Sequence, residues 1–395
     1  TYILEFGDQY IRFFKDKGQI VSGSPAAAYE IASPYLEAEL FDIKFAQSAD
    51  VMYLTHPNHD VRKLSRTGHT SWTLATVSFT GSPSLPISGA DDRPSCVSFF
   101  EQRLVFAGTT DEPQTLFFSK AGDYENMTTG TNADDAMVYT IASNQVNAIR
   151  YMKAVRTLVV GTTGGEFTVS ADGTDASITP TNITIKRQSS FGSANVDAIP
   201  AGNAILFLQK AKRKIRELQY NFDSDGYQAP DLTILNETVT DTGINEMSYQ
   251  QEPGSNIWCV RDDGVLACLT YQRSENVIAW SRHIFGGAFG SGKAVCESVA
   301  SISGVLTEDE VWVIVKRTIN GATKRFVECF SDFDFDETSA TSFKFLDSHL
   351  SYSGGATTTL SGLSHLEGQT VSILGDGATH ANKTVSSGAI TLDRS

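Results

Sequence analysis

Apolar, β-branched segments and short glycine-rich turns follow one another along most of the chain, in a pattern typical of β-hairpins. The clearest case is residues 158–162, which lead to Gly164 and Gly165 and then to a second β-rich segment, 166–169. Glycine supplies the positive φ angles of a tight turn, and β-branched residues favour the flanking strands. First strands of the same kind begin at residues 3, 51, 104, 158, 205, 257 and 311. Seven hairpins are therefore predicted, roughly fifty residues apart.

A repeat of this length, with several short strands in each unit, indicates a solenoid, an array or a β-propeller. Apolar strands also precede the hairpins, as at 97–100 and 146–149, and follow most of them, as at 277–280. Each unit then has the strands of one blade, and a ring of blades leaves only short sheet edges. We predict that residues 1–330 form an irregular propeller of six or seven blades.

The pattern changes after residue 330. Residues 331–344 are acidic with interleaved phenylalanines and are predicted to be a linker. Residues 345–395 contain brief β segments with glycine-rich turns, which predicts the start of a small β-barrel or sandwich domain. We expect this domain to be incomplete and the chain to be a fragment of a longer one. Helical periodicity is scarce, with short turns expected only at 35–45 and 231–235.

The composition narrows the class of protein. Hydrophobic residues make up 41% and charged residues 19%, which fits a globular β protein and not a disordered one. No apolar run approaches the ~20 residues of a membrane-spanning helix. The net charge of −15 disfavours tight nonspecific DNA binding, which needs cationic side chains to release counterions. It is compatible with DNA that passes without adhering, because an acidic wall repels phosphates.

The five cysteines include no CxxC pair, so the usual zinc spacings are absent. If Asp263 and Gly264 form a two-residue turn, Cys259 and Cys268 lie directly opposite each other. A cross-strand disulfide is then one possibility. The favoured alternative is two reduced, buried cysteines that pack as small hydrophobic residues.

Two acidic or glycine-rich motifs resemble ligand sites. Residues 287–293, GAFGSGK, match a phosphate-binding loop except that Ala294 replaces the final Ser or Thr, and a strand follows instead of a helix. We interpret this segment as a flexible loop between blades. Asp332, Asp334 and Asp336 have calcium-loop spacing, but Glu337 occupies the position of the required glycine. A solvated acidic face is expected, with a cation site as the alternative, and no cofactor is predicted.

One basic cluster stands out in this acidic chain. It contains Lys210, Lys212, Arg213, Lys214 and Arg216. Strand alternation predicts that the side chains at 210, 212 and 214 share one side while that at 213 lies on the other. The cluster could contact an acidic neighbouring subunit or partner, contact DNA phosphates, or form an ordinary solvated hairpin.

Catalytic signals are weak. His56, His59 and Asp60 lie close together in a predicted loop, but the sequence places no third metal ligand near them, so structural hydrogen bonds are expected. No nucleophile is paired with a base, and the repeated turns of sialidase propellers are missing. A glycosidase would need two carboxylates in one pocket, and the sequence nominates no such pair. We therefore predict a non-enzymatic protein.

Long strings in the chain resemble tail proteins of short-tailed bacteriophages, which are identified as tail tubular, stabilisation or nozzle proteins. The strings are QSADVMYLTHP (47–57), RKLSRTGHTSW (62–72), FEQRLVFAG (100–108), FSKAGDYEN (118–126), TIASNQVN (140–147), SFGSAN (190–195), GLSHLEG (362–368) and VSSGAITL (385–392). They are spread over nearly the whole chain.

This resemblance implies a structural role in the virion tail. Nozzle proteins are similar to irregular propellers that assemble as a homohexameric ring below the head–tail adaptor. They extend the channel for the double-stranded DNA, retain the genome before infection and support the tail fibres. The alternative is a propeller-type glycan-binding adhesin that uses Trp72, Trp258, Trp280 or Trp312.

Overall fold

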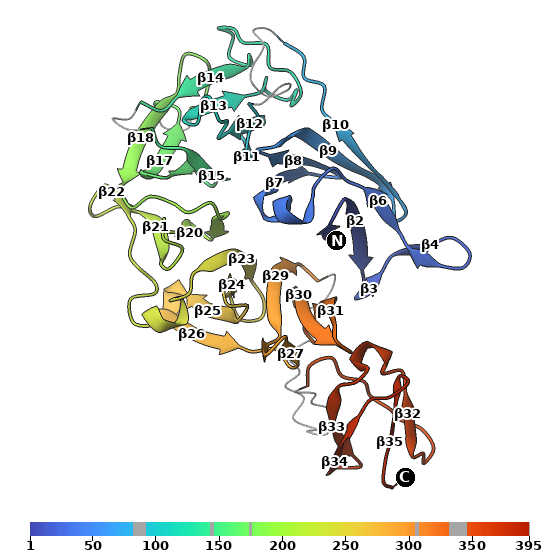
Figure 1. Cartoon of the computed structure of the whole chain (residues 1–395). Helices are drawn as coiled ribbons and strands as arrows, with labels where there is room; N and C mark the ends of the chain where they lie inside the picture. Colours follow the sequence, from blue (N-terminus) through green and yellow to red (C-terminus); the bar gives the residue numbers. More distant parts are fainter. Residues whose placement is uncertain (82–91, 143–145, 174–175, 305–307, 332–345, 395) are drawn as a thin grey trace. The chain divides into compact units, whose positions relative to one another are not determined.

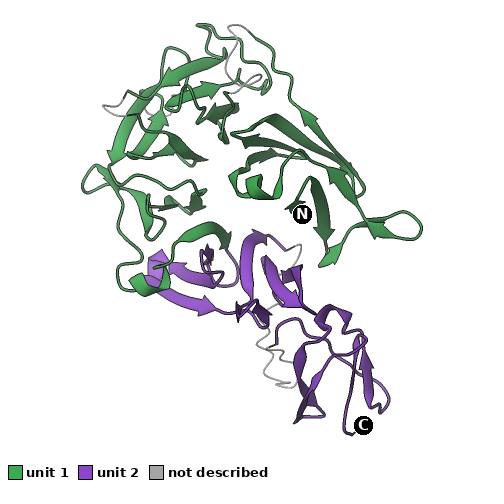
Figure 2. Ribbon diagram, in the orientation of Figure 1, with its two compact units in different colours: residues 1–249 green, residues 250–395 purple. Residues whose placement is uncertain are grey.

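The computed structural model describes residues 1–81, 92–142, 146–173, 176–304, 308–331 and 346–394. The described chain consists of β-strands and a few short 3-10 turns, so the all-β prediction is confirmed. It divides into two compact units, residues 1–249 and 250–395 (Figure 2). Among the described residues, no helix is long and apolar enough to cross a membrane.

Seven antiparallel sheets follow one another along the chain as blades of a β-propeller (Figure 1). The first contains β1 (Ile3–Gly7), β2 (Tyr10–Lys15), β3 (Gly18–Gln19) and β6 (Glu30–Ala32), and the second contains β7 (Lys44–Ser48), β8 (Val51–His56), β9 (His59–Gly68) and β10 (Ser71–Thr76). The third contains β11 (Cys96–Phe100), β12 (Arg103–Ala107), β13 (Thr115–Phe118) and β14 (Met137–Thr140), and the fourth contains β15 (Ile149–Ala154), β16 (Leu158–Thr162), β17 (Gly165–Ser170) and β18 (Thr184–Ser189).

The remaining blades have the same antiparallel plan. The fifth contains β19 (Ile199–Ala201), β20 (Ala204–Leu208), β21 (Ile215–Asn221) and β22 (Gly226–Gln228), and the sixth contains β23 (Ile244–Gln250), β24 (Asn256–Arg261), β25 (Leu266–Gln272) and β26 (Val277–His283). The seventh contains β29 (Val295–Ile302), β30 (Glu310–Ile319) and β31 (Ala322–Cys329).

The smaller elements lie outside these blades. The two-stranded sheets pair β4 (Val21–Ser22) with β5 (Ala27–Ala28), β27 (Ala288–Phe289) with β28 (Gly292–Lys293), β32 (Thr359–Ser361) with β35 (Ala389–Thr391), and β33 (Thr370–Gly375) with β34 (Ala378–Thr384). The 3-10 turns are η1 (Glu37–Asp42), η2 (Glu237–Val239), η3 (Arg273–Glu275) and η5 (Ser364–Leu366). Thus the turn expected at 35–45 is confirmed, whereas η2 begins just after the segment 231–235.

Every predicted hairpin is present. They are β1–β2, β8–β9, β12–β13, β16–β17, β20–β21, β24–β25 and β30–β31. Of the two predicted blade counts, seven is the one observed. The linker and the small C-terminal domain stay predictions. Within residues 346–394, Leu363, Val385 and Ile390 form a local apolar cluster.

The central strands are apolar at consecutive positions because both of their faces are covered. In β12, Val105 belongs to a core cluster with Met152 and Phe167 of the fourth sheet. Its neighbour Phe106 belongs to a second cluster that contains Tyr53 of the second sheet. Successive side chains of a strand point to opposite faces. A strand between two stacked sheets therefore reads as a continuous apolar run, which is how the hairpins could be located from the sequence.

The two-residue turn that would place Cys259 directly opposite Cys268 is not formed. Cys259 lies opposite Ala267, and Cys268 lies opposite Trp258. The turn is one residue longer than a two-residue loop, with Gly264 at φ +77° and the Arg261 N–H donating to the Val265 carbonyl. A shift of one residue moves a side chain to the other face of the sheet. None of the five cysteines forms a disulfide. Cys259 and Cys268 are both buried, so the favoured prediction of reduced, buried cysteines is confirmed.

The segment 287–293 is also more ordered than expected. It forms the β27–β28 hairpin instead of an irregular loop, and the Gly290 N–H donates to Thr318 Oγ1 at 2.9 Å. The predicted strand that follows it is confirmed as β29. A phosphate-binding loop would require a helix at that point.

We predict that a thiol reagent labels one cysteine rapidly in the folded protein and all five after denaturation. Cys329 is partly accessible, while the other four are buried. Burial and the nearby Cys268 raise the pKa of Cys259 well above that of a free thiol, and burial raises the pKa of Cys268 to about 12, so neither forms a reactive thiolate. The Cys329→Ser variant should lose the fast phase. Tandem mass spectra that link the peptides of Cys259 and Cys268 would contradict this assignment.

Candidate functional site

The basic cluster of residues 210–216 is a turn followed by the start of β21, so the predicted strand alternation is wrong. The Gln209 N–H donates to the Lys214 carbonyl, and the Lys212 N–H donates to the Gln209 carbonyl. Lys212 has a φ of +60°, which a regular strand does not allow. The side chains at 210, 212 and 214 therefore do not follow the alternation of a strand.

Two of the five cations in this cluster, Lys214 and Arg216, interact with neighbouring groups of the same chain. Lys214 lies 2.8 Å from Asp231 and 3.4 Å from Glu237, and the hydrogen bond to Asp231 raises the pKa of Lys214. Arg216 donates to the Gln209 side chain and the Ala229 carbonyl, and its guanidinium lies 3.5 Å from the ring centre of Phe191.

The other three cations of the cluster are less enclosed. Lys212 donates to Asn245 Oδ1 at 2.9 Å. Lys210 and Arg213 are exposed. These two side chains are therefore the members of the predicted cluster that present charge to solvent.

The other predicted site, Asp332, Asp334 and Asp336, lies outside the described residues.

A buried lysine that sequence reasoning missed joins several blades. Lys44 of β7 has 7% of its surface exposed, and its ammonium donates to the Arg150 carbonyl of β15 and to Asn195 Oδ1 at 2.9 Å. The sulfur of Cys96, on β11, lies 3.7 Å from the same nitrogen. Asn195 in turn donates to Asp42 at 3.1 Å. The first strands β7, β11 and β15 of three sheets thus meet around one charge.

A buried carboxylate lies between the fourth and fifth sheets. Glu166 of β17 is fully buried and accepts hydrogen bonds from Ser189 and, at 2.8 Å, from Ser193. Burial raises the pKa of Glu166, although both serine hydrogen bonds and the charge of Arg216 act in the opposite direction. A buried carboxyl group of this kind favours the protonated form in the folded state.

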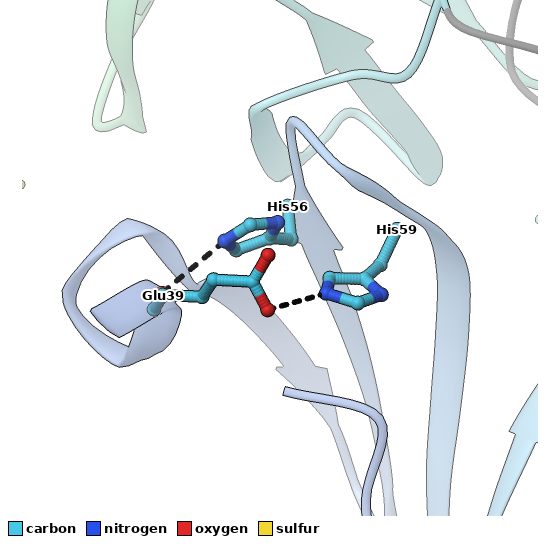
Figure 3. A group of neighbouring side chains, drawn as sticks. All are labelled: Glu39, His56 and His59. Carbon is cyan, nitrogen blue, oxygen red and sulfur yellow. Dashed lines mark hydrogen bonds and ion pairs between the residues drawn. The ribbon is translucent and has the colours of Figure 1, made fainter. Parts of the chain in front are cut away.

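The structure brings two predicted loop histidines together with a carboxylate that the sequence did not suggest. His56 ends β8 and His59 begins β9, where they form a cross-strand pair on either side of Pro57 and Asn58. Glu39 comes from η1, and its carboxylate lies between the two imidazole rings (Figure 3). The expectation that no third ligand lies nearby is therefore wrong. The third residue of the predicted loop, Asp60, instead pairs with Arg93 at 2.8 Å.

Hydrogen bonds hold this cluster in a defined arrangement. His59 Nε2 lies 2.8 Å from Glu39 Oε2, and His56 Nε2 lies 3.2 Å from the Glu39 carbonyl oxygen (Figure 3). The Asn58 N–H donates to His56 Nδ1 at 3.0 Å. The ring of Tyr35 covers both imidazoles, at centroid distances of 5.8 and 5.0 Å.

The charges in the cluster follow from these contacts. The Leu36 amide and the His59 side chain lower the pKa of Glu39 to about 2, so the group is a carboxylate at neutral pH. Burial lowers the pKa of His56, with a further contribution from His59, which favours a neutral ring. The arrangement offers imidazole and carboxylate donors, and it contains no nucleophile.

The tryptophans considered for glycan binding mostly pack inside the sheets. Trp258 and Trp312 are buried at 7% and 5% exposure. Trp72 stacks on Phe13 with ring centres 4.3 Å apart. Burial prevents the first two from stacking on a sugar.

No family model matches the chain, and the search of curated proteins found no match. The solved structures that are similar to it include two β-propeller domains. The β-propeller domain of Cps50 (Swd1) from Myceliophteria thermophila is 9% identical with a TM-score of 0.42, and the match covers 79% of this chain and 95% of that one. The WD40 domain of Pan2 from Neurospora crassa is also 9% identical, with a TM-score of 0.44 and coverage of 79% and 81%. At this identity the likeness concerns the fold alone.

We predict that Lys44→Met lowers the free energy of unfolding by about 2–4 kcal/mol, because the substitution leaves buried carbonyl and amide oxygens without their charged donor. Urea denaturation of the purified chain measures the change. Lys186→Met, at an exposed position of β18, is the matched control and should change little. Equal midpoints for the two variants would show that Lys44 does not hold the sheets together.

A second prediction concerns the pH dependence of stability. Because the pKa of Glu166 is higher in the folded state, its contribution is greatest below the unfolded-state pKa and is lost as pH rises through the folded-state value. Glu166→Gln cannot ionise. The variant should therefore gain stability relative to the natural protein between pH 4.5 and pH 8 in urea denaturation. If the free energies of unfolding of Glu166→Gln and of the natural protein changed in parallel with pH, the raised pKa of Glu166 would be contradicted.

Proposed function

We propose that this chain is a structural subunit of a short-tailed bacteriophage tail nozzle, located in the tail of the virion. In this proposal six copies form a ring that extends the DNA channel below the head–tail adaptor. The ring retains the packaged genome and guides it out during ejection. The observation that carries the proposal is the set of phage-like strings spread from residue 47 to residue 392.

The position of those strings in the fold supports a mechanical role for the segments. The string 47–57 contains all of β8, with His56 at its end, and Pro57 of the turn that follows. The string 190–195 supplies Ser193, which donates to Glu166, and Asn195, which accepts from Lys44. Two residues of the string 190–195 thus connect neighbouring sheets, which supports a role in a rigid wall.

The charge balance suits a conduit for DNA. The chain carries a net charge of −15, and within its basic cluster Lys214 is paired internally with Asp231. Acidic surfaces repel phosphates, so DNA can move past them without being held. No sequence-specific contact is needed for this function.

Lys210 and Arg213 supply the proposed contact between copies. They are exposed cations on a strongly acidic chain, so an acidic surface of the neighbouring copy is an electrostatically complementary partner. The glycan-binding alternative has less support, since Trp258 and Trp312 are buried.

Electron microscopy of the purified chain and of particles that contain it tests the proposal. We expect a ring of six copies with a channel wide enough for duplex DNA, roughly 20 Å, at the base of the tail. A monomer at micromolar concentration in virion-like buffer, or a position outside the tail, would overturn the proposal. Specific binding on a glycan array would favour the adhesin.

We predict that the double substitution Lys210→Glu and Arg213→Glu weakens assembly at least tenfold, because it replaces attraction between copies with repulsion. Mass photometry over a concentration series measures this, and added salt should reduce the difference between the variants by screening the charges. The matched control is Lys186→Glu with Lys293→Glu, which reverses two exposed lysines elsewhere. If both double variants assemble alike, the cluster is not the contact.

A further inference from the structure

Glu39, His56 and His59 form a cluster of side chains whose donor atoms could ligate a metal ion. One donor atom from each residue lies within 4.8 Å of the donor atoms of the other two. Two structural features cause this. The β8–β9 turn places both histidines on one face, and η1 positions the Glu39 carboxylate between their rings (Figure 3).

The donor set suits a particular class of ion. Imidazole nitrogen binds zinc, copper, iron and nickel well, whereas calcium and magnesium prefer oxygen donors alone. Two histidines and one carboxylate, with an open fourth position, form a known kind of zinc ligand set. In a tetrahedral site with bonds of about 2.0–2.1 Å, donor atoms lie roughly 3.3 Å apart. The donor atoms lie within 4.8 Å of one another, so binding requires them to approach by up to about 1.5 Å. Rotation of the Glu39 side chain, which lies on a short 3-10 turn, can supply this movement.

The hydrogen bonds of His56 identify its ligand atom. The Asn58 N–H can only donate, so His56 Nδ1 carries the lone pair and, in the neutral ring, Nε2 carries the proton. That proton faces the Glu39 carbonyl oxygen at 3.2 Å. A histidine that binds metal usually donates its other ring N–H to a carbonyl or carboxylate in this way. An ion at Nδ1 would take the place of the Asn58 N–H.

The cluster also has an enclosed side and an open side. His56 is fully buried, whereas the side chains of His59 and Glu39 are 20% and 18% exposed. The Tyr35 ring forms one wall, edge-on to His59 at 5.0 Å. An ion can therefore enter from solvent while one ligand stays fixed in the core.

We propose that Glu39, His56 and His59 bind a divalent transition-metal ion of the zinc class, with water in the remaining position. The ion cross-links η1, the connection between the first and second sheets, to the β8–β9 turn. We assign the ion a structural role, because it would join two segments of the chain that only the fold brings together. The proposal does not depend on the assembly or location of the protein.

The test uses the full chain, stripped with a chelator, and the metals Zn²⁺ and Co²⁺ by themselves. We expect one equivalent of Zn²⁺ to bind in calorimetry and to raise Tm by several degrees, since the ion binds the folded state. Co²⁺ should give the visible absorption of a four-coordinate site. His59→Ala and Glu39→Gln should each weaken Zn²⁺ binding at least tenfold and abolish the Tm shift.

His349→Ala removes an exposed histidine elsewhere and is the control for adventitious binding. It should bind Zn²⁺ as the natural chain does. If His59→Ala fails to fold, as judged by circular dichroism, Glu39→Gln decides the question, because it preserves the size of the side chain and removes the charged donor. The metal site would be rejected if Glu39→Gln bound Zn²⁺ with the same affinity and the same Tm shift as the natural chain. It would also be rejected if the natural chain bound no Zn²⁺, and the cluster would then be held by hydrogen bonds alone.

Discussion

The burial of the Lys44 ammonium is the constraint on which the first unit of the fold depends. An uncompensated ammonium inside a protein costs several kcal/mol, so its acceptors must be in place when it is covered. Those acceptors are the Arg150 carbonyl and the Asn195 side chain, which come from the fourth sheet and from the segment leading to the fifth. Cys96 of the third sheet lies beside them. One charge therefore requires several neighbouring sheets to stack correctly at once, and Asn195 extends the network to Asp42.

Around this polar centre, stability comes from sheets covered on both faces. Val105 and Phe106 are adjacent in β12, yet they belong to two different apolar clusters. Removal of a blade would expose the inner faces of its neighbours, so each sheet contributes to the burial of the next. This is the physical reason that a repeat of small sheets, each too small to fold alone, makes a stable protein.

Packing also explains why the candidate sites are not the ones that the charges in the sequence alone would suggest. The basic cluster is conspicuous in the sequence, but Lys214 and Arg216 interact with other groups of the same chain. Its exposed members, Lys210 and Arg213, are the ones that a partner could contact. The cluster around Glu39 was inconspicuous in the sequence because its carboxylate comes from a different segment. Function in a scaffold of this kind depends on which polar groups the packing leaves accessible.

Local pattern alone determined the seven hairpins, since strand periodicity and turn residues act between near neighbours in the chain. It did not determine the register of β24 and β25, because one additional turn residue moved Cys259 away from Cys268. Nor could it place Lys44 next to Asn195, which is 151 residues away. It did not bring Glu39 to His56 and His59 either, since a connector and a hairpin turn meet only when adjacent sheets pack. Hairpins are local, whereas a buried charge or a ligand cluster exists only once distant segments share one environment.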